Sequence, residues 1–172
     1  MTGPPSDFEF VDVIVEIPMG SANKFEFDPT VLRIRLTRRL PVGMVYPADY
    51  GFVPGTLSKD GDPLDALVLG REPTFSGCVI RVKPLGVLWT RDQEGRDPKI
   101  IGALDVDSRE DDLDDLNDVP NRVLREIEHF FDVYKDLEPE KYSEIEGFGG
   151  RDEAREEIAA ATRRFRAAPP DH

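Results

Sequence analysis

Short runs of apolar residues, several of them alternating with polar ones, recur along the first hundred residues and predict short β-strands. The clearest run covers residues 11–17, where Val or Ile recurs at every second position until Pro18 and Gly20 end it. The same period of two is found at residues 24–28 and 32–36. Residues 64–69 and 79–89 predict two more strands, and residues 100–106 can pair with the second of these across the loop at 92–98. Many short strands separated by Gly and Pro indicate a closed or nearly closed barrel.

The last third of the chain is helical in pattern. Apolar residues from Val123 to Tyr134 fall at helical spacing, after start signals at residues 117–120. A second helix is predicted over residues 152–166, with an apolar stripe that consists of Ala154, Ile158, Ala161 and Phe165. Its acids lie in the first turn and its arginines in the last, which suits the helix dipole. We therefore expect an α+β fold, a small β-barrel with two flanking helices, as a single domain over residues 1–172 with flexible tails at 1–7 and 167–172.

Composition narrows the function classes. The chain has 35 acidic and 22 basic residues, a net charge of -13, so we expect no binding to nucleic acid or to an anionic membrane surface. Its single cysteine, Cys78, excludes an internal disulfide and the usual cysteine zinc site, and is interpreted as a packing residue. No apolar run is long enough to span a membrane, and the start shows no signal-peptide pattern. These features predict a cytoplasmic protein.

The most informative motif runs from Asp60 to Asp65. It places three carboxylates, on Asp60, Asp62 and Asp65, within six residues, while Gly61 permits a tight turn and Pro63 fixes its own φ. Carboxylates this close repel one another unless a cation lies between them, and all-oxygen ligands favour Mg²⁺ or Ca²⁺. The spacing is not that of an EF-hand loop. A surface turn of the Asx type explains the local pattern about equally well.

Two further groups of charged residues can contribute to the same chemistry. Asp92 and Asp97 flank a predicted hairpin loop with Lys99 two residues on, although a polar hairpin tip is the simpler local interpretation. Strand alternation places Lys24 and Glu26 on one face. With Glu16 and Arg38 these offer acids for a metal and cations for an anion, unless they form ordinary cross-strand ion pairs on a solvated face.

Aromatic and remaining polar features weigh less. Tyr46 and Tyr50 lie near a proline turn, and Tyr134 ends the first helical pattern; phenols can donate to phosphate or carboxylate, but simple packing is the strong alternative for Tyr134. Residues 107–118 contain seven acids without an ordered set of basic partners, and we interpret them as a solvated loop. A lone His129 is weak evidence for zinc or for a catalytic triad.

Taken together, these residues resemble the soluble family I inorganic pyrophosphatases. The resemblance covers roughly residues 8–166, and the ordered set is far more specific than any one piece. In order along the chain, the matching residues are Glu16-Ile17-Pro18, Lys24-Phe25-Glu26, Arg38, Tyr46-Pro47, Tyr50-Gly51, Asp60-Gly61-Asp62-Pro63-Leu64-Asp65, Asp92, Asp97, Lys99, His129-Phe130-Phe131 and Tyr134-Lys135-Asp136-Leu137-Glu138.

The resemblance implies a five-stranded, OB-like barrel with helices beside it, and Mg²⁺-dependent hydrolysis of pyrophosphate to two orthophosphates. Several Mg²⁺ ions are implied, with Mn²⁺ or another divalent ion as a substitute. Asp60, Asp65 and Asp97 would hold the first metal, and Asp65 would reach the second largely through water. Asp92 and Asp97 would help to hold a metal that arrives with substrate, and Glu26 another.

The resemblance also implies roles for the remaining site residues. Asp62 would be the general base beside the attacking water. Phosphate oxygens would be bound by Lys24, Arg38, Tyr134 and Lys135, the site would be tuned by Glu16, Tyr50 and Lys99, and Tyr46 would line it. Bacterial relatives suggest a homo-oligomer, specifically a hexamer.

Departures from the family pattern are modest. Phe25 stands where a tyrosine is common, and Thr37 stands where an aspartate is frequent. Because Arg39 follows Arg38 directly, the sequence does not decide which of the two arginines faces phosphate. Two other functions stay in view: a non-catalytic module that binds divalent cations or phosphate on the same barrel, and a hydrolase of organic diphosphates. The general-base candidate Asp62 favours the enzyme over the module, and no aromatic patch is evident for a base or sugar.

Overall fold

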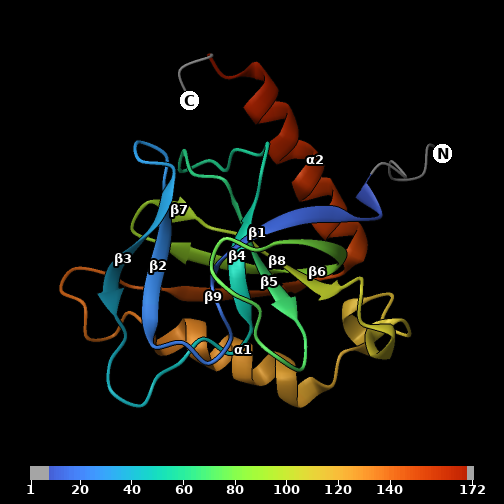
Figure 1. Ribbon diagram of the computed structural model, residues 1–172, viewed down its shortest axis with the longest axis horizontal. Coiled ribbons are helices and arrows are strands. Elements are labelled where there is room, and N and C mark those ends of the chain that lie inside the picture. Colours follow the sequence, from blue (N-terminus) through green and yellow to red (C-terminus); the bar gives the residue numbers. More distant parts are fainter. Residues whose placement is uncertain (1–7, 170–172) are drawn as a thin grey trace.

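Five strands close into a ring, as the alternating pattern predicts (Figure 1). A computed structural model describes residues 8–169 of the chain. The neighbouring strands around the ring are β1 (Val11–Ile17), β4 (Asp49–Val53), β5 (Leu64–Leu69), β8 (Lys99–Leu104) and β6 (Val79–Asp92), and β6 pairs back onto β1. All these pairings are antiparallel except that of β5 with β8. Closure satisfies the strand edges that an open sheet would expose.

The long strand β6 makes closure possible. Its first half pairs with β1 and its middle with β8, and a register shift between Pro84 and Gly86 bends it. Close contact also needs glycine where β4 crosses β1, because a Cβ on Gly51 would lie 1.9 Å from the carbonyl oxygen of Ile14. No other residue fits there without moving a strand.

Four shorter elements extend this ring. A separate two-stranded ribbon consists of β2 (Asn23–Asp28) and β3 (Arg33–Arg39), and the end of β6 folds back as a hairpin with β7 (Gly95–Arg96). Strand β9 (Glu144–Gly149) pairs with the second half of β6. The sequence pattern did not predict β4 or β9 as strands. All five residues of β4 are buried, so it has no alternation, and β9 is rich in charge and glycine.

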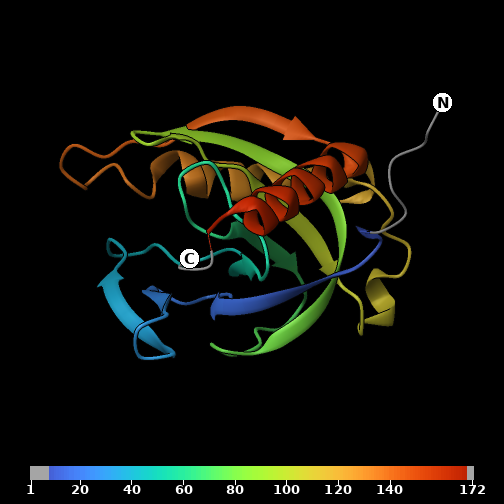
Figure 2. The ribbon, with the colours of Figure 1, turned by 90° about the horizontal axis from the view of Figure 1, so that it is seen from above.

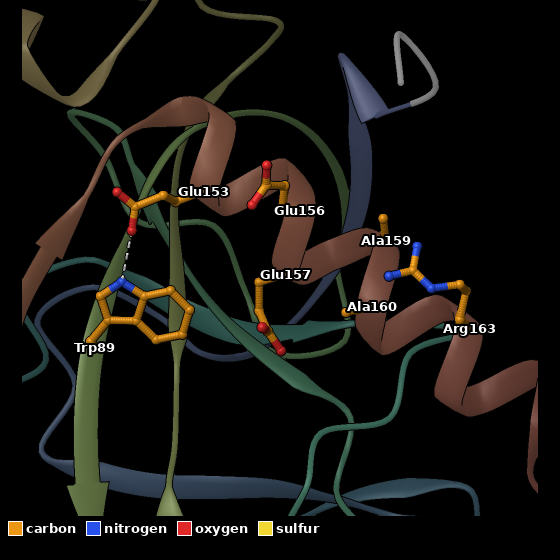
Figure 3. A pocket seen from close by; sticks show the side chains of 7 residues that line it. All are labelled: Trp89, Glu153, Glu156, Glu157, Ala159, Ala160 and Arg163. Carbon is orange, nitrogen blue, oxygen red and sulfur yellow. Dashed lines mark hydrogen bonds between the residues drawn. The ribbon is translucent and has the colours of Figure 1, made fainter. Parts of the chain in front are cut away.

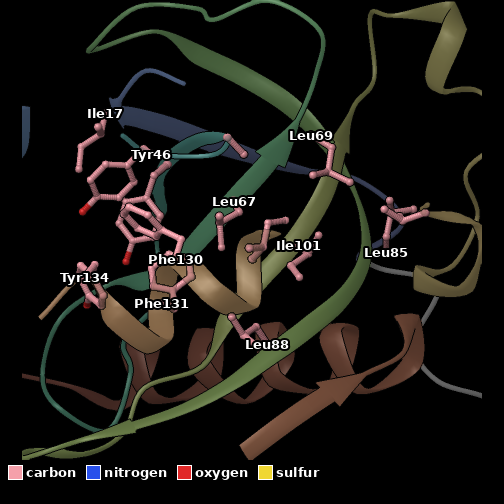
Figure 4. Close-up of a cluster of buried hydrophobic side chains, with 14 of the residues drawn as sticks. Ile17, Tyr46, Leu67, Leu69, Leu85, Leu88, Ile101, Phe130, Phe131 and Tyr134 are labelled. Carbon is pink, nitrogen blue, oxygen red and sulfur yellow. The ribbon is translucent and has the colours of Figure 1, made fainter. Parts of the chain in front are cut away.

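The two predicted helices are present and cover different parts of the barrel (Figures 1 and 2). Helix α1 (Asn121–Val133) buries Ile127, Phe130 and Phe131 in one core cluster, which Figure 4 shows with Tyr46 and Tyr134 beside them. Helix α2 (Arg151–Ala167) buries its apolar stripe in a second cluster with β1, β5 and β6. Each amphipathic helix therefore closes one side of the barrel.

Some details differ from the sequence-based expectations. Phe165 is 42% exposed, so the stripe of α2 ends one turn earlier than expected. Ala167, expected in a flexible tail, belongs to α2; residues 1–7 and 170–172 lie outside the described part of the chain. Of residues 8–169, no helix is long and apolar enough to cross a membrane.

The sequence predicts a solvated loop for the acidic segment 107–118, but the structure differs. It contains two 3-10 turns, η2 (Ser108–Glu110) and η3 (Leu116–Asp118). Asp115 accepts a hydrogen bond from the backbone N–H of Asn117 at 3.2 Å and another from Arg151 at the start of α2 at 3.1 Å. The buried side chain of Leu116 anchors the segment. One carboxylate thus satisfies unpaired N–H groups of two helices.

Candidate active site

Strand register places a buried lysine among acids. The parallel pairing of β5 and β8 sets Asp65 opposite Lys99. The Lys99 ammonium lies 3.0 Å from the carboxylate of Asp65, 2.9 Å from that of Asp97 and 3.1 Å from the phenol oxygen of Tyr50. Burial alone would lower the pKa of Lys99, but the charge of Asp65, with Tyr50 and Asp97, raises it well above its usual value. Lys99 is therefore a fixed positive charge at the base of the site.

A hairpin brings Asp92 and Asp97 to the same region. Asp92 pairs with Gly95 at the end of β6, and the Lys135 ammonium lies 3.1 Å from the Asp92 carboxylate. Tyr142 donates from its hydroxyl to the Asp92 carbonyl oxygen at 2.9 Å. Burial lowers the pKa of Lys135, but Tyr134 and Asp92 outweigh it and the net pKa is raised. Lys135 therefore stays charged. Lys135 and Tyr142, which both follow helix α1 in the chain, hold the hairpin through Asp92.

The acidic motif forms a turn on the loop between β4 and β5. The Asp60 carboxylate accepts a hydrogen bond from the Asp62 backbone N–H at 3.0 Å, and Gly61 adopts a φ of 94°. This is the Asx-type turn considered as the alternative to a cation site. Both residues are exposed at the surface although the protein partly surrounds their carboxylates, so the turn leaves them accessible to a ligand.

Partial burial raises the pKa values of these acids, and repulsion from neighbouring acids adds to the increase. Burial raises the pKa of Asp60, and the charges of Asp97 and Asp92 add to the increase. Burial also raises the pKa of Asp62, and the charges of Asp60, Asp65, Glu94 and Glu26 add to the increase. For Asp97, burial is again the largest cause, Lys99 opposes it, and Asp65 adds to it. Acids from the 60–65 loop, the 92–97 hairpin and strand β2 therefore share one electrostatic field.

The donor set fits a hard divalent cation by its chemistry. Carboxylate oxygens are the ligands that Mg²⁺ accepts, and a cation would relieve the repulsion just described. Within residues 8–169, however, no three His, Cys, Asp or Glu side chains are already grouped as a metal site. Lys99 holds Asp65 and Asp97 instead, so the carboxylates would have to turn toward a shared cation.

The β2–β3 ribbon supplies the group predicted around Lys24. The Lys24 ammonium lies 2.7 Å from the Glu26 carboxylate, which agrees with their predicted common face. The Glu16 carboxylate accepts a hydrogen bond from the Phe27 backbone N–H at 2.7 Å and so ties the ribbon to β1. Burial raises the pKa of Glu16 to about 7, with Asp65 and Glu26 adding to burial and the Phe27 N–H opposing it.

Arg38 and Arg39 differ in environment. Arg38 lies opposite Lys24 in the ribbon, and its guanidinium is 2.8 Å from the Glu138 carboxylate, whereas Arg39 is exposed. The charge of Arg38 also acts on the Tyr46 phenol. Sequence reasoning did not assign Glu138 or Tyr142 a role; both follow Tyr134 closely, but nothing in their spacing distinguishes them from surface residues.

The three tyrosines form an aromatic wall with helix α1. Ring centroids of Tyr46 and Tyr50 are 5.3 Å apart, and those of Tyr46 and Phe130 are 4.8 Å apart. Tyr134 stacks on Phe130 at 5.3 Å and is almost fully buried, so the packing role weighed for it is present (Figure 4). Burial raises the pKa of Tyr46 and of Tyr50, so both phenols stay protonated and can donate hydrogen bonds.

Other features lie apart from this region. His129 is exposed on α1, and Cys78 packs against the second core cluster. A shallow surface hollow of about 460 Å³ along α2 shares no residue with the acidic site; its lining includes Trp89, Glu153 and Arg163 (Figure 3). The chemistry-bearing residues are therefore concentrated at the barrel end formed by the loops after β4, β6 and α1.

Comparison with known proteins shows which family this chain resembles. The family profile of inorganic pyrophosphatase matches residues 13–166. The chain is 50% identical over 149 residues to the inorganic pyrophosphatase of Leifsonia xyli subsp. xyli, covering 87% of this chain and 91% of the relative. It is 44% identical over 160 residues to that of Thermus thermophilus, covering 92% and 91%. The crystal structure of inorganic pyrophosphatase from Thermus thermophilus matches with a TM-score of 0.91 at 42% identity and covers 97% of each chain. The chain belongs to the inorganic pyrophosphatase family.

Proposed function

We propose that the protein is an inorganic diphosphatase that uses Mg²⁺ to hydrolyse pyrophosphate to two orthophosphates. Family membership supports the reaction. The observation that carries the proposal for this chain is the shared field of acids from three separate segments, bordered by the cations Lys24 and Lys135. Pyrophosphate carries about three to four negative charges near neutral pH, and a protein of net charge -13 would repel it unless cations neutralise both.

The metal-binding roles follow the carboxylates. Asp60, Asp65 and Asp97 would hold the first ion, and Asp65 would reach a second largely through water. Asp92 and Asp97 would help to hold an ion that arrives with substrate, and Glu26 would hold another on the far phosphate. Bound divalent ions would neutralise charge and lower the pKa of a coordinated water well below that of bulk water.

Asp62 is the proposed general base. Its backbone N–H and carbonyl oxygen hold the turn, bonding to the Asp60 carboxylate and the Ser58 N–H, so its exposed carboxylate is free of that task. A general base must lie within hydrogen-bond reach of the proton that it accepts. A carboxylate on a well-anchored turn meets that demand better than one on a loose loop.

Phosphate oxygens would be bound by Lys24, Arg38, Tyr134 and Lys135. Fixed cations stabilise the charge that develops on the leaving phosphate without reorganisation. Lys99 would tune the carboxylates of Asp65 and Asp97 that it contacts, with Tyr50 hydrogen-bonded to it, and Glu16 would hold the ribbon that carries Lys24. Tyr46 would line the site. No single side chain can supply the roughly 15–20 kcal/mol that catalysis of so slow a hydrolysis demands.

The decisive experiment is phosphate release by the purified protein. We expect release from pyrophosphate with Mg²⁺, a lower rate with Mn²⁺, none with EDTA, and little from ATP. Binding of Mg²⁺ and pyrophosphate without phosphate release would instead identify a non-catalytic binding module. Equal rates with ATP would favour a hydrolase of organic diphosphates.

We also expect a homo-oligomer, a hexamer by family resemblance, which sedimentation of the same preparation measures.

A further inference from the structure

The C-terminal half of helix α2 is bonded directly to the loop that carries Asp60 and Asp62. The Arg164 guanidinium donates from Nε to the carbonyl oxygen of Leu57 at 2.7 Å, across 107 residues of sequence. The Leu57 N–H in turn donates to the carbonyl oxygen of Ala161 at 3.0 Å. The helix therefore holds both backbone polar groups of one loop residue, Leu57. A hydrogen bond from a charged donor is stronger than a neutral one.

This anchor leads directly into the acidic turn. Ser58, which follows Leu57, is buried; its N–H donates to the Asp62 carbonyl oxygen at 2.7 Å, and its carbonyl oxygen accepts from the Gly61 N–H at 3.2 Å. Two backbone hydrogen bonds therefore join the turn that carries Asp60 and Asp62 to Ser58. A displacement of Leu57 would move Ser58 and the turn together.

Arg164 is itself held in place. Its Nη2 lies 2.6 Å from the Glu157 carboxylate, two helical turns earlier, and the two side chains are 28% and 17% exposed. The neighbouring residues Arg163 and Glu156 are exposed, and both line the surface hollow on α2, as Glu157 also does (Figure 3). The helix therefore offers an anchoring Arg–Glu pair next to an exposed Arg and Glu of the same chemistry.

We propose that Arg164, oriented by Glu157, is a positioning residue that sets the place of the Asp60–Asp62 turn in the active site. It touches no reacting atom and acts through Leu57 and Ser58. A misplacement of about 1 Å can cost on the order of a hundredfold in rate, so a partly released turn is expected to slow turnover. This inference rests on the proposed pyrophosphatase function.

The kinetic test uses Arg164→Gln in the full chain. We expect kcat to fall about tenfold while KM for pyrophosphate changes less than about twofold, because Lys24 and Lys135 lie on other elements. Arg164→Lys keeps a cationic donor and should restore part of kcat. Glu157→Gln should lower kcat in the same direction but less. The matched controls Arg163→Gln and Glu156→Gln should leave both constants unchanged.

A second measurement does not depend on activity. Amide hydrogen exchange at Gly61 and Asp62 should be at least about fivefold faster in Arg164→Gln than in the unaltered protein or in Arg163→Gln. If the unaltered protein releases no phosphate, the proposed function fails, and the exchange rates still decide the positioning role. Unchanged exchange overturns the inference, as does an Arg164→Gln protein with normal kcat and only a lower melting temperature. Should Arg164→Gln not fold, Arg164→Lys and Glu157→Gln decide by the same readouts.

Discussion

Two acid-rich regions of this protein have opposite electrostatics. In the active-site region, burial and neighbouring acids raise the pKa values of Asp60, Asp62 and Asp97. In the segment 107–118, hydrogen bonds from Arg109 and Lys83 lower the pKa values of Asp107 and Asp114. Both regions are dense in aspartate, so the number of acids alone does not make a site.

The difference lies in how each region is paired. In the 107–118 segment, Asp107 and Asp114 each have a basic partner and Asp115 accepts from a backbone N–H, and water screens the exposed acids. In the other region, two acids, Asp65 and Asp97, share the buried Lys99. Partly buried acids whose negative charge is not fully compensated by basic partners are the ones that attract a further cation.

Removal of the shared lysine should have the largest effect. Lys99→Met leaves Asp65 and Asp97 without their buried partner and should cost about 3–5 kcal/mol of the free energy of unfolding in EDTA. The matched change Lys83→Met removes the ion pair with Asp114, 66% exposed, and should cost about 0–1 kcal/mol. Urea unfolding of both variants measures the two costs. Equal costs would remove the distinction between the regions.

Activity should separate the regions next. Asp65→Asn removes one proposed metal-binding charge and should lower turnover at least about a hundredfold, or about 2.7 kcal/mol of activation free energy. Asp112→Asn, at an exposed position of the acidic segment, should change it little. Steady-state phosphate release with saturating Mg²⁺ measures both. Similar losses at the two positions would contradict the site assignment.

Thermal stability should report the same contrast without substrate. Mg²⁺ that binds only the folded protein stabilises it by about 2.7 kcal/mol at a hundred times its Kd, so the melting temperature should rise with Mg²⁺. Asp65→Asn should reduce this rise, and Asp112→Asn should preserve it. Differential scanning fluorimetry over a Mg²⁺ series measures the shift. A rise that survives in Asp65→Asn but is lost in Asp112→Asn would place the cation in the other region.

The smallest effect tests the structural role of the acidic segment. Asp115→Ala removes the acceptor for the Asn117 and Arg151 N–H groups and should cost about 1 kcal/mol of stability. Turnover at 25 °C should be unchanged, because the proposed site is not involved. Chemical unfolding and phosphate release on one preparation, with Asp112→Ala as the control, measure both quantities. A large loss of turnover in Asp115→Ala would show that the segment serves catalysis.

Local patterns in the sequence determined the regular elements. A period-two run predicted β1, and helical spacing predicted α1 and α2, because one buried face imposes its period on the residues. A period-two run also predicted β2, although none of its residues is buried. Strand β4 was missed because burial on every side removes that period, and β9 because its pairing with β6 supplies the order that its own residues lack.

The candidate site was found from the sequence through the order of its motifs, since any single motif had an equally good local explanation. Only the tertiary structure decided how the residues meet: the parallel register of β5 and β8 that sets Asp65 against Lys99, the ion pair of Lys135 with Asp92, and the bond from Arg164 to Leu57. Contacts between residues far apart in the chain depend on strand register and helix placement, and these are fixed by how the whole core packs. The sequence by itself therefore determined which side chains are available, and the fold determined which of them share a charge.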